Sequence, residues 1–500
     1  MTKHKFIAWI FLFFGSSPLI YSQSSKNFTY PKGKLAQVFA LENEDPEESF
    51  LLAFRFFNYL DLVFLNESME YQRKLEISSF PKQREGGLAV QAISNSSKKL
   101  NLIVADGLWV NEYESLLFCI DKQSGEYESR RLSLSEEKID ELEKADVRLL
   151  KIFQSKDRFY KLWIDEQASL LHILYFDLTE IEKGIPQLTS IDISETGLAK
   201  KLGISDDYSI PLISNKSDAS IAGNASPEKI YHLAQNILIS FEEEDQTKFL
   251  IIDTENWELS TKLFPFPDFD ENQEKIRLNS YLYEKDLYQV SFDERGVHLS
   301  IADFGSGKLL YSRRWEAEDK FLEDFPVHKK INYNSKRLLI KDADNMWYRF
   351  SKGISVLVET DGKTERLSIG SHNIIPRKSK NLLGATMAIG TFGGAIGASS
   401  LGSAGGSPSV LGGYPFSTNQ LTKAVYYFGE GLIYRADTNW DAENFELSST
   451  NVSLAPFDRM MKEIDKIQQE KNIYSMSLFE KNDKSYFGYW WKKQYHILDF

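Results

Sequence analysis

The feature that most constrains this sequence is a short phrase that recurs along its 500 residues. In each copy an apolar, strand-like run ends near Asp or Asn, a polar turn follows, and a second strand-like run leaves. The side-chain oxygen of Asp or Asn accepts hydrogen bonds from backbone N–H groups two residues on, and so nucleates such a turn. The copies are residues 62–66, 117–121, 173–177, 249–253, 299–303, 356–361, 433–437 and 496–499.

The spacing of the copies predicts the architecture. Most successive copies lie 50 to 62 residues apart, which suits a four-stranded blade with long loops, and two lie 76 apart. The two longer intervals contain polar or glycine-rich stretches, 200–229 and 374–420, that we interpret as loop insertions. The sequence therefore predicts an all-β fold: a single closed β-propeller of about seven or eight four-stranded blades. Short surface helices are expected at 135–144 and 458–471.

Two segments carry a resemblance to known proteins. Residues 249–264 and 298–315 resemble the hairpin of β-propeller repeats, especially quinoprotein-like and WD40-like blades, where an aspartate turn leads through glycine to an outer strand. The resemblance is to a repeat unit and covers most of the chain loosely. The regular Trp-Asp ending of WD40 repeats and the glycine–tryptophan docking pattern of quinoprotein blades are both missing from the sequence, so the resemblance does not imply a quinone cofactor.

The amino terminus predicts export. Residues 1–23 have the order of a secretory signal peptide: Lys3 and Lys5, an apolar run at 6–14, then small or polar residues. The apolar run is too short to span a bilayer, which takes about 20 residues. We therefore expect a periplasmic or extracellular protein, bacterial in style, with a propeller-like domain at 24–500.

Two further expectations follow from an exported chain. The extended segment 34–41 is predicted to pair with 495–499, so that the start of the chain completes the last sheet and closes the ring. Cys119 is the only cysteine and cannot form an internal disulfide. Because it lies in an apolar run, we expect it to be a small buried hydrophobe.

Charge narrows the choice of partner. The chain carries 59 basic and 72 acidic side chains, a formal net charge of −13. Such a surface repels phosphate backbones, so nucleic-acid binding is not expected. The remaining partner classes are an envelope protein or a glycan, bound by a monomeric ring.

Sequence motifs for catalysis are missing. No histidine pair has the spacing of a metal site, and no nucleophile elbow, phosphate-binding loop or dinucleotide-binding loop is found in a strand–helix setting. No cofactor is therefore expected, and a non-enzymatic function is favoured. Acids from different blades can still meet around one channel, which leaves glycan hydrolysis as an alternative.

One loop has the composition of a calcium site. Asp342, Asp344 and Asn345 supply the hard oxygen ligands that calcium prefers. The loop lacks the glycine and terminal glutamate of a helix–loop–helix calcium site, and these residues can equally be solvated turn acids.

The most unusual stretch is glycine-rich. No charged residue occurs between Lys380 and Lys423. Residues 382–414 are predicted to contact a membrane or a partner through four apolar side chains: Met387, Ile389, Phe392 and Ile396. The alternative is a low-complexity loop that projects from a blade.

Aromatic residues cluster near the carboxyl terminus. Tyr489, Trp490 and Trp491 could stack on sugars or on an extended peptide, or could pack between blades. Taken together, the sequence favours an exported, non-enzymatic binding or scaffolding protein of the cell envelope or exterior. A glycan-active propeller hydrolase is the alternative, and a membrane-associated assembly component that docks through its glycine-rich loop is the third.

Overall fold

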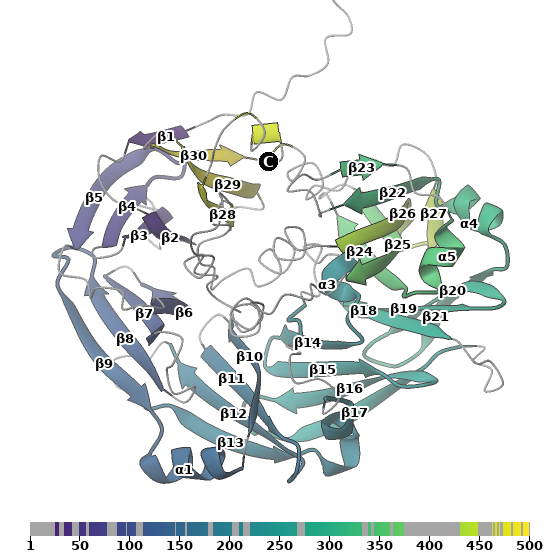
Figure 1. Cartoon of the computed structure of the whole chain (residues 1–500), viewed down its shortest axis with the longest axis horizontal. Helices are drawn as coiled ribbons and strands as arrows, with labels where there is room; N and C mark the ends of the chain where they lie inside the picture. The colour runs from purple at the N-terminus through teal and green to yellow at the C-terminus, as the bar shows by residue number, and fades with distance from the viewer. Residues whose placement is uncertain are drawn as a thin grey trace, which may run out of the picture.

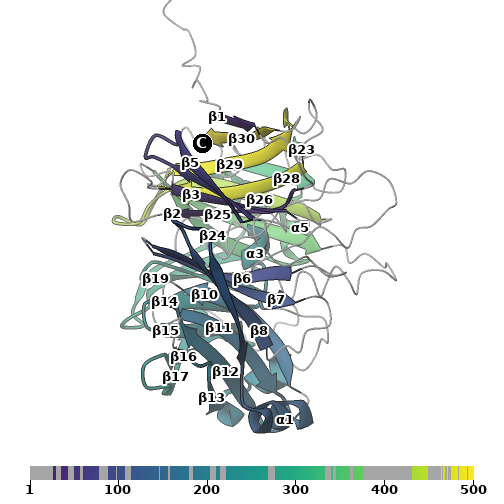
Figure 2. The same cartoon turned by 90° about the vertical axis from the view of Figure 1, so that its left-hand side faces the viewer.

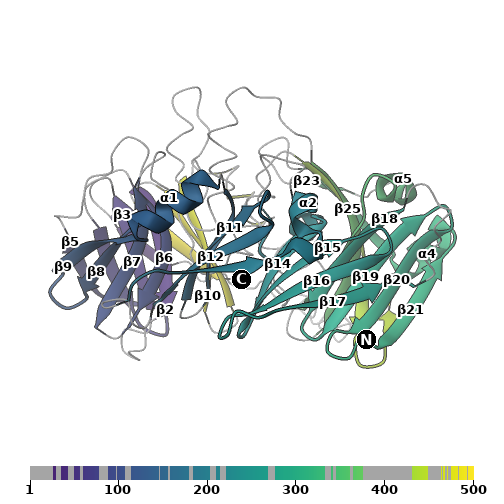
Figure 3. The same ribbon diagram turned by 90° about the horizontal axis from the view of Figure 1, so that it is seen from below.

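The computed structural model describes residues 26–499 except for several segments, chiefly 43–49, 78–87, 203–209, 214–220, 268–275, 375–430 and 449–462. The described residues form seven antiparallel sheets, which confirms the all-β prediction. Figure 1 shows the sheets following one another around a common centre, and Figures 2 and 3 show them from the side and from below.

The first five sheets each have four strands in chain order. Sheet 1 is β2 (Leu35–Glu42), β3 (Phe50–Phe56), β4 (Leu60–Leu65) and β5 (Tyr71–Ile77). Sheet 2 is β6 (Leu88–Asn95), β7 (Lys99–Asp106), β8 (Glu114–Asp121) and β9 (Tyr127–Ser133). Sheet 3 is β10 (Arg148–Ser155), β11 (Arg158–Asp165), β12 (Leu170–Asp177) and β13 (Gln187–Asp192). Sheet 4 is β14 (Glu228–Leu233), β15 (Asn236–Glu242), β16 (Gln246–Asp253) and β17 (Leu259–Pro265). Sheet 5 is β18 (Arg277–Tyr283), β19 (Asp286–Asp293), β20 (Gly296–Asp303) and β21 (Leu309–Trp315).

The last two sheets depart from this order. Sheet 6 runs β23-β22-β26-β25-β24, and sheet 7 runs β1-β30-β29-β28. The strands of sheet 6 are β22 (Val327–Asn332), β23 (Leu339–Lys341), β24 (Ser355–Thr360), β25 (Glu365–Ile374), β26 (Gly431–Asp441) and β27 (Glu446–Ser448). The strands of sheet 7 are β1 (Lys26–Thr29), β28 (Tyr474–Lys481), β29 (Lys484–Trp491) and β30 (Gln494–Asp499). Because β26 is 11 residues long, its first half pairs with β22 and its second half with β27.

Short helices lie in the connections between strands. They are α1 (Glu136–Lys144), η1 (Ser194–Thr196), α2 (Leu198–Leu202), α3 (Ile221–Asn224), α4 (Glu318–Asp324) and α5 (Met346–Phe350). The helix α1 confirms the expectation for 135–144, and its first turn carries Glu136 and Glu137, which favour a helix amino terminus. Most of the second expected helix, 458–471, lies outside the described residues.

Three of the predicted aspartate turns, at Asp121, Asp253 and Asp303, have the expected hydrogen bonds. Asp121 Oδ1 accepts hydrogen bonds from the N–H groups of Gln123 and Ser124, at 2.9 and 2.7 Å. Asp253, Asp303 and Asp441 make the same type of contact with the N–H groups two or three residues on. The residue four positions after each Asp has a positive φ: Gly125 (77°), Trp257 (63°), Gly307 (74°) and Phe445 (55°). Only the two glycines adopt this conformation without a steric cost.

One predicted turn lies at a different residue from the one expected. The sequence put an aspartate turn at Asp437, but that residue lies inside β26 and is fully buried. The turn comes four residues later, at Asp441. Asp437 follows an apolar run in the sequence, but β26 continues for four residues beyond it and ends at Asp441.

Among the described residues, clusters of the core lie between neighbouring sheets. Between sheets 3 and 4, for example, Leu162, Ile173, Ile239 and Leu250 are fully buried in one cluster. Burying each such side chain contributes about 1.5–3 kcal/mol. Each sheet therefore depends on its neighbours, as the repeat pattern implies.

The start of the chain pairs with its end, although through a different strand from the one expected. Residues 26–29 of β1, and not 34–41, pair with β30, with Thr29 opposite Gln494. The predicted segment instead forms β2, the first strand of sheet 1, and pairs with β3. The run 34–41 is the more apolar of the two, whereas 26–29 contains a single large apolar residue, so packing and not local hydrophobicity selects the strand that pairs with β30.

The expected insertion at 200–229 is described in part, and that part is built into the core. Leu212 forms a parallel bridge with Ile230 on β14, and α3 contacts β24, β25 and β26 of sheet 6. Asn224 is fully buried in α3 and donates to Val356 O (2.5 Å) and Ser280 O (3.2 Å). This segment therefore ties sheets 4, 5 and 6 together near the centre, where Figure 1 places α3.

Candidate functional site

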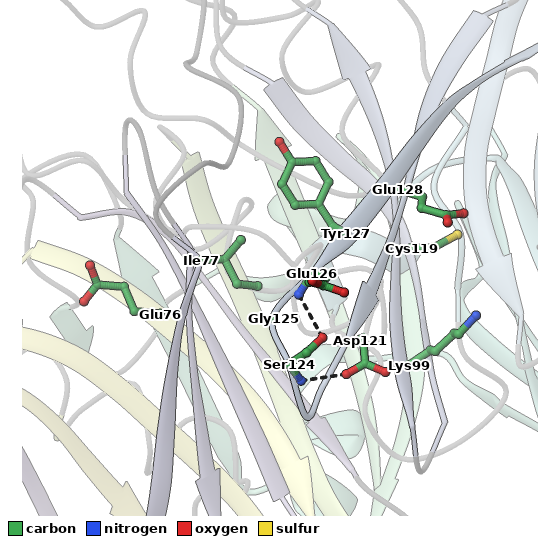
Figure 4. A pocket seen from close by; sticks show the side chains of 10 residues that line it. All are labelled: Glu76, Ile77, Lys99, Cys119, Asp121, Ser124, Gly125, Glu126, Tyr127 and Glu128. Atoms are coloured by element: carbon green, nitrogen blue, oxygen red, sulfur yellow. Dashed lines mark hydrogen bonds between the residues drawn. The ribbon is translucent and has the colours of Figure 1, made fainter.

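A groove of about 700 Å³ lies between sheets 1 and 2. Its walls come from the end of β5 on one side and from β8, β9 and the turn between them on the other (Figure 4). Glu76 and Ile77 contribute from β5, and Cys119, Asp121 and Tyr127 are among the residues on the opposite wall. We call this feature the groove.

An aspartate turn builds one wall of the groove. Gly125 N donates to Asp121 O at 2.9 Å, and the φ of Gly125 is 77°, a conformation that L side chains rarely adopt. A Cβ atom at Gly125 would lie 3.3 Å from Leu75 Cδ1 on β5. Glycine adopts this φ without steric cost, and it lets the turn lie close to Leu75 of sheet 1.

A second contact fixes the two walls relative to each other. Arg73 Nη1, on β5, donates to Lys122 O in the turn of sheet 2 at 3.0 Å. The guanidinium carbon of Arg73 also lies 3.7 Å from the centre of the Phe64 ring, and Lys122 Nζ donates to Asn95 Oδ1 at 3.2 Å. Arg73 stacks on the Phe64 ring and also donates to Lys122 O, so these two contacts hold the walls of the groove in place.

Carboxylates dominate the charge of the groove. Four of its ten lining side chains are acidic, and one is basic: Glu76, Asp121, Glu126, Glu128 and Lys99. Hydrogen bonds from Ser124 lower the pKa of Asp121 below its ordinary value, so this carboxyl group stays ionised at neutral pH. The groove therefore favours cationic groups over phosphates.

Cys119 was expected to be buried but is partly exposed on the groove wall. Along β8, Phe118 and Ile120 are buried, whereas the Cys119 side chain is intermediate in exposure. The apolar run around it suggested burial on every side, but alternate residues of a strand point to opposite faces.

The predicted calcium loop lies mostly outside the described residues. Asp342 and Asp344 are not described; Asn345 is exposed at the start of α5, with a φ of 57°. Within the described part of the chain, no group of three or more His, Cys, Asp or Glu side chains could hold a metal ion. The calcium site stays a prediction.

The glycine-rich loop also lies outside the described residues. Residues 375–430 contain all four of its predicted contact side chains: Met387, Ile389, Phe392 and Ile396. Among the helices that the structure does describe, none is long and apolar enough to cross a membrane.

The aromatic cluster at the carboxyl terminus is described in part. Tyr489 is 2% exposed, and its ring stacks on His496 at a centroid distance of 4.9 Å. Trp491 is partly exposed and lies 5.7 Å from the same imidazole ring. The burial of Tyr489 favours packing over a ligand platform at that position; the side chain of Trp490 lies outside the described residues, and a platform at Trp490 and Trp491 stays a prediction.

Sequence reasoning missed an ionic cluster inside sheet 6. Asp437 Oδ2 lies 3.0 Å from Lys329 Nζ, and Arg435 bridges Asp437 and Glu359. Burial tends to raise the pKa of Asp437, but the charges of Arg435, Lys329 and Arg366 outweigh it and hold that pKa well below its ordinary value. Arg435 and Asp437 lie two positions apart in the sequence, which on a strand places them on one face, and this pattern could have indicated the cluster.

The comparisons with known proteins bear on the fold alone. No protein-family model and no curated protein matches the chain. Solved structures similar to it include the WD40 domain of SCAP from fission yeast, at 10% identity over 69% of this chain and 65% of that one, with a TM-score of 0.27. The Dos1 propeller is similar at 9% identity over 93% of this chain and 78% of that one, with a TM-score of 0.30. The β-propeller domain of Nup133 from Vanderwaltozyma polyspora is similar at 9% identity over 66% of this chain and 80% of that one, with a TM-score of 0.26.

The chain spans 65% of the SCAP domain in that comparison. The assignment to β-propeller repeats rests on the chain's own four-stranded antiparallel sheets, which confirm the resemblance seen in the sequence.

Proposed function

We propose that this chain is an exported, non-enzymatic binding or scaffolding protein of the cell envelope or exterior, built as a closed ring of seven blades. The pairing of β1 with β30 supports closure, because it joins the two ends of the described chain in one sheet. The signal-like order of residues 1–23 supports export.

The groove between sheets 1 and 2 is the observation that carries the binding role. It is preformed, because the Asp121 turn and Arg73 fix both of its walls. It combines acidic side chains with Ile77 and the ring of Tyr127, a mixture that suits recognition. Asp121 supports binding over catalysis, since its backbone hydrogen bonds stabilise the charged form and oppose proton transfer.

A pull-down from the native envelope tests this function. The bait is the mature protein, compared with a variant in which three groove acids are neutralised: Glu76→Gln, Glu126→Gln and Glu128→Gln. A matched control neutralises three exposed acids of α1: Glu136→Gln, Glu137→Gln and Glu141→Gln. We expect one envelope partner to be retained by the wild type and the control and lost, by at least about tenfold, from the groove variant.

Related experiments test the two alternative functions, glycan hydrolysis and membrane-associated assembly. Turnover of a glycan on a carbohydrate array by the wild type would support the hydrolase and overturn the non-enzymatic proposal. Loss of membrane association on deletion of 382–414, with groove binding unchanged, would support the membrane-associated assembly component. Equal partner recovery by the groove variant and the wild type would overturn the assignment to the groove.

A further inference from the structure

The joint between sheets 5 and 6 carries a cluster of acids and aromatic rings that the proposed function does not use. On sheet 5, Tyr283 and Asp286 are register partners at the β18–β19 turn; on sheet 6, Glu365 and Trp440 are partners on β25 and β26. Partners in an antiparallel pair share one face of their sheet. We call these side chains, together with Tyr288, the joint cluster.

Contacts across the joint show that the two faces meet. Trp440 Nε1 donates to Tyr288 Oη at 3.1 Å, and Tyr283 Oη donates to Glu365 Oε1 at 3.4 Å. The rings of Tyr288 and Trp440 are 6.4 Å apart, edge to face. Asp286 lies on the same face of β19 as Tyr288, because side chains two positions apart on a strand point the same way.

Each carboxyl group of the cluster has one buried oxygen atom without a hydrogen-bond partner among the described residues, although Glu365 Oε1 accepts from Tyr283 Oη. Asp286 is 9% exposed, and its Oδ1 atom is buried with no hydrogen-bond partner among the described residues. Glu365 Oε2 is likewise buried without one. A buried, ionised carboxylate that lacks a partner is costly, so such a group tends to bind a proton instead.

The charged groups around the joint raise the pKa of Asp286 and Glu365, except for Lys285, which lowers that of Asp286. The described titratable groups near these carboxyls are Glu284, Lys285, Asp303, Tyr311 and Asp441. Burial, first, and then the charges of Asp303 and Glu284 raise the pKa of Asp286, against Lys285, which lowers it. Burial, then Glu284, and also Asp441 raise the pKa of Glu365, against hydrogen bonds from Tyr283 and from the backbone of Ala442, which lower it. Asp437 in the same sheet shows the opposite arrangement, with cations on several sides.

We propose that protons bound by Asp286 and Glu365 hold the joint between sheets 5 and 6 closed, so that the joint loosens as the pH rises. Free carboxyl groups titrate near pH 4. Because the folded pKa values of both groups lie above their unfolded values, their stabilising contribution is full below about pH 4 and is lost as the pH rises through the folded values.

Hydrogen exchange of the full mature chain, followed by mass spectrometry from pH 4.5 to 7.5, tests this directly. After correction for the intrinsic exchange rate, we expect peptides covering 277–293 and 355–374 to lose about tenfold protection for each unit by which the two pKa values are raised. Peptides covering 148–165, in sheet 3, serve as the internal reference and should change little, because the shifted groups there, Lys151 and Tyr160, titrate above this pH range.

Two variants test whether the pH dependence of hydrogen exchange comes from Asp286 and Glu365 or from general effects of pH on the protein. Asp286→Asn and Glu365→Gln imitate the protonated groups, so each should flatten the pH dependence in sheets 5 and 6. Glu443→Gln, which changes an exposed acid in the neighbouring turn, should leave it as in the wild type. Glu365 is only partly buried, so Glu365→Gln keeps the test valid if Asp286→Asn fails to fold. A profile that is equally steep in the wild type and Glu365→Gln, or equally steep in the reference peptides of sheet 3, would overturn the proposal.

Discussion

Asn224 offers the sharpest test of how the sheets are tied together. Its side chain is fully buried in α3, and the two N–H groups of Nδ2 share three acceptors: Ser280 O of sheet 5 (3.2 Å), Asn279 Oδ1 (3.2 Å) and Val356 O of sheet 6 (2.5 Å). In Asn224→Ala these acceptors lose their donor while staying buried. One hydrogen bond contributes about 1 kcal/mol, and each buried acceptor left unpaired costs about 1–3 kcal/mol. The expected loss is about 3–5 kcal/mol of unfolding free energy.

Equilibrium unfolding in urea, followed by tryptophan fluorescence, measures this loss. The control is Asn256→Ala, which removes an exposed side chain that accepts one local hydrogen bond, from Glu258 N at 2.9 Å. That change should cost less than about 1 kcal/mol. If the two variants unfold within about 1 kcal/mol of each other, the argument that α3 ties sheets 5 and 6 together is refuted.

Three further changes probe other parts of the account. Gly296→Ala should destabilise the β19–β20 hairpin by more than about 3 kcal/mol, because a Cβ there would lie 1.9 Å from Trp315 O at a φ of 110°; thermal unfolding reports it. Asp437→Asn should cost about 3–5 kcal/mol at neutral pH, since it leaves buried cations uncompensated. The lowered pKa of Asp437 makes its contribution one that is lost as the pH falls, so wild type and variant should converge in an acid titration of stability. Asp303→Ala should cost only about 1 kcal/mol, because it removes one turn acceptor for Ser306 N; urea midpoints test this.

The repeat could be predicted because its signal is local. Asp121, Asp253 and Asp303 accept hydrogen bonds from N–H groups two or three residues on, so neighbouring residues determine each turn. Asp437 carries the same local phrase, yet it lies inside a long strand beside Lys329, more than 100 positions away. Nothing near Asp437 in the sequence reveals that partner.

The sites were harder to predict for the same reason. The groove forms where Leu75 of one sheet meets Gly125 of the next, and the joint cluster forms where Asp286 and Glu365 approach from separate sheets. Each residue alone is typical of a turn or a strand end. Only the packing of one sheet against the next gives them a shared environment.

The central claim, that the start of the chain closes the ring, is tested most directly by a disulfide cross-link. Thr29 of β1 is the register partner of Gln494 of β30, whereas Gln37 of β2 pairs with Arg55 in sheet 1. In a background with Cys119→Ala, Thr29→Cys with Gln494→Cys should oxidise to an intramolecular disulfide that shifts mobility on a non-reducing gel. Gln37→Cys with Gln494→Cys should not. Failure of the first pair to cross-link, or equal cross-linking of the second, would contradict closure by β1.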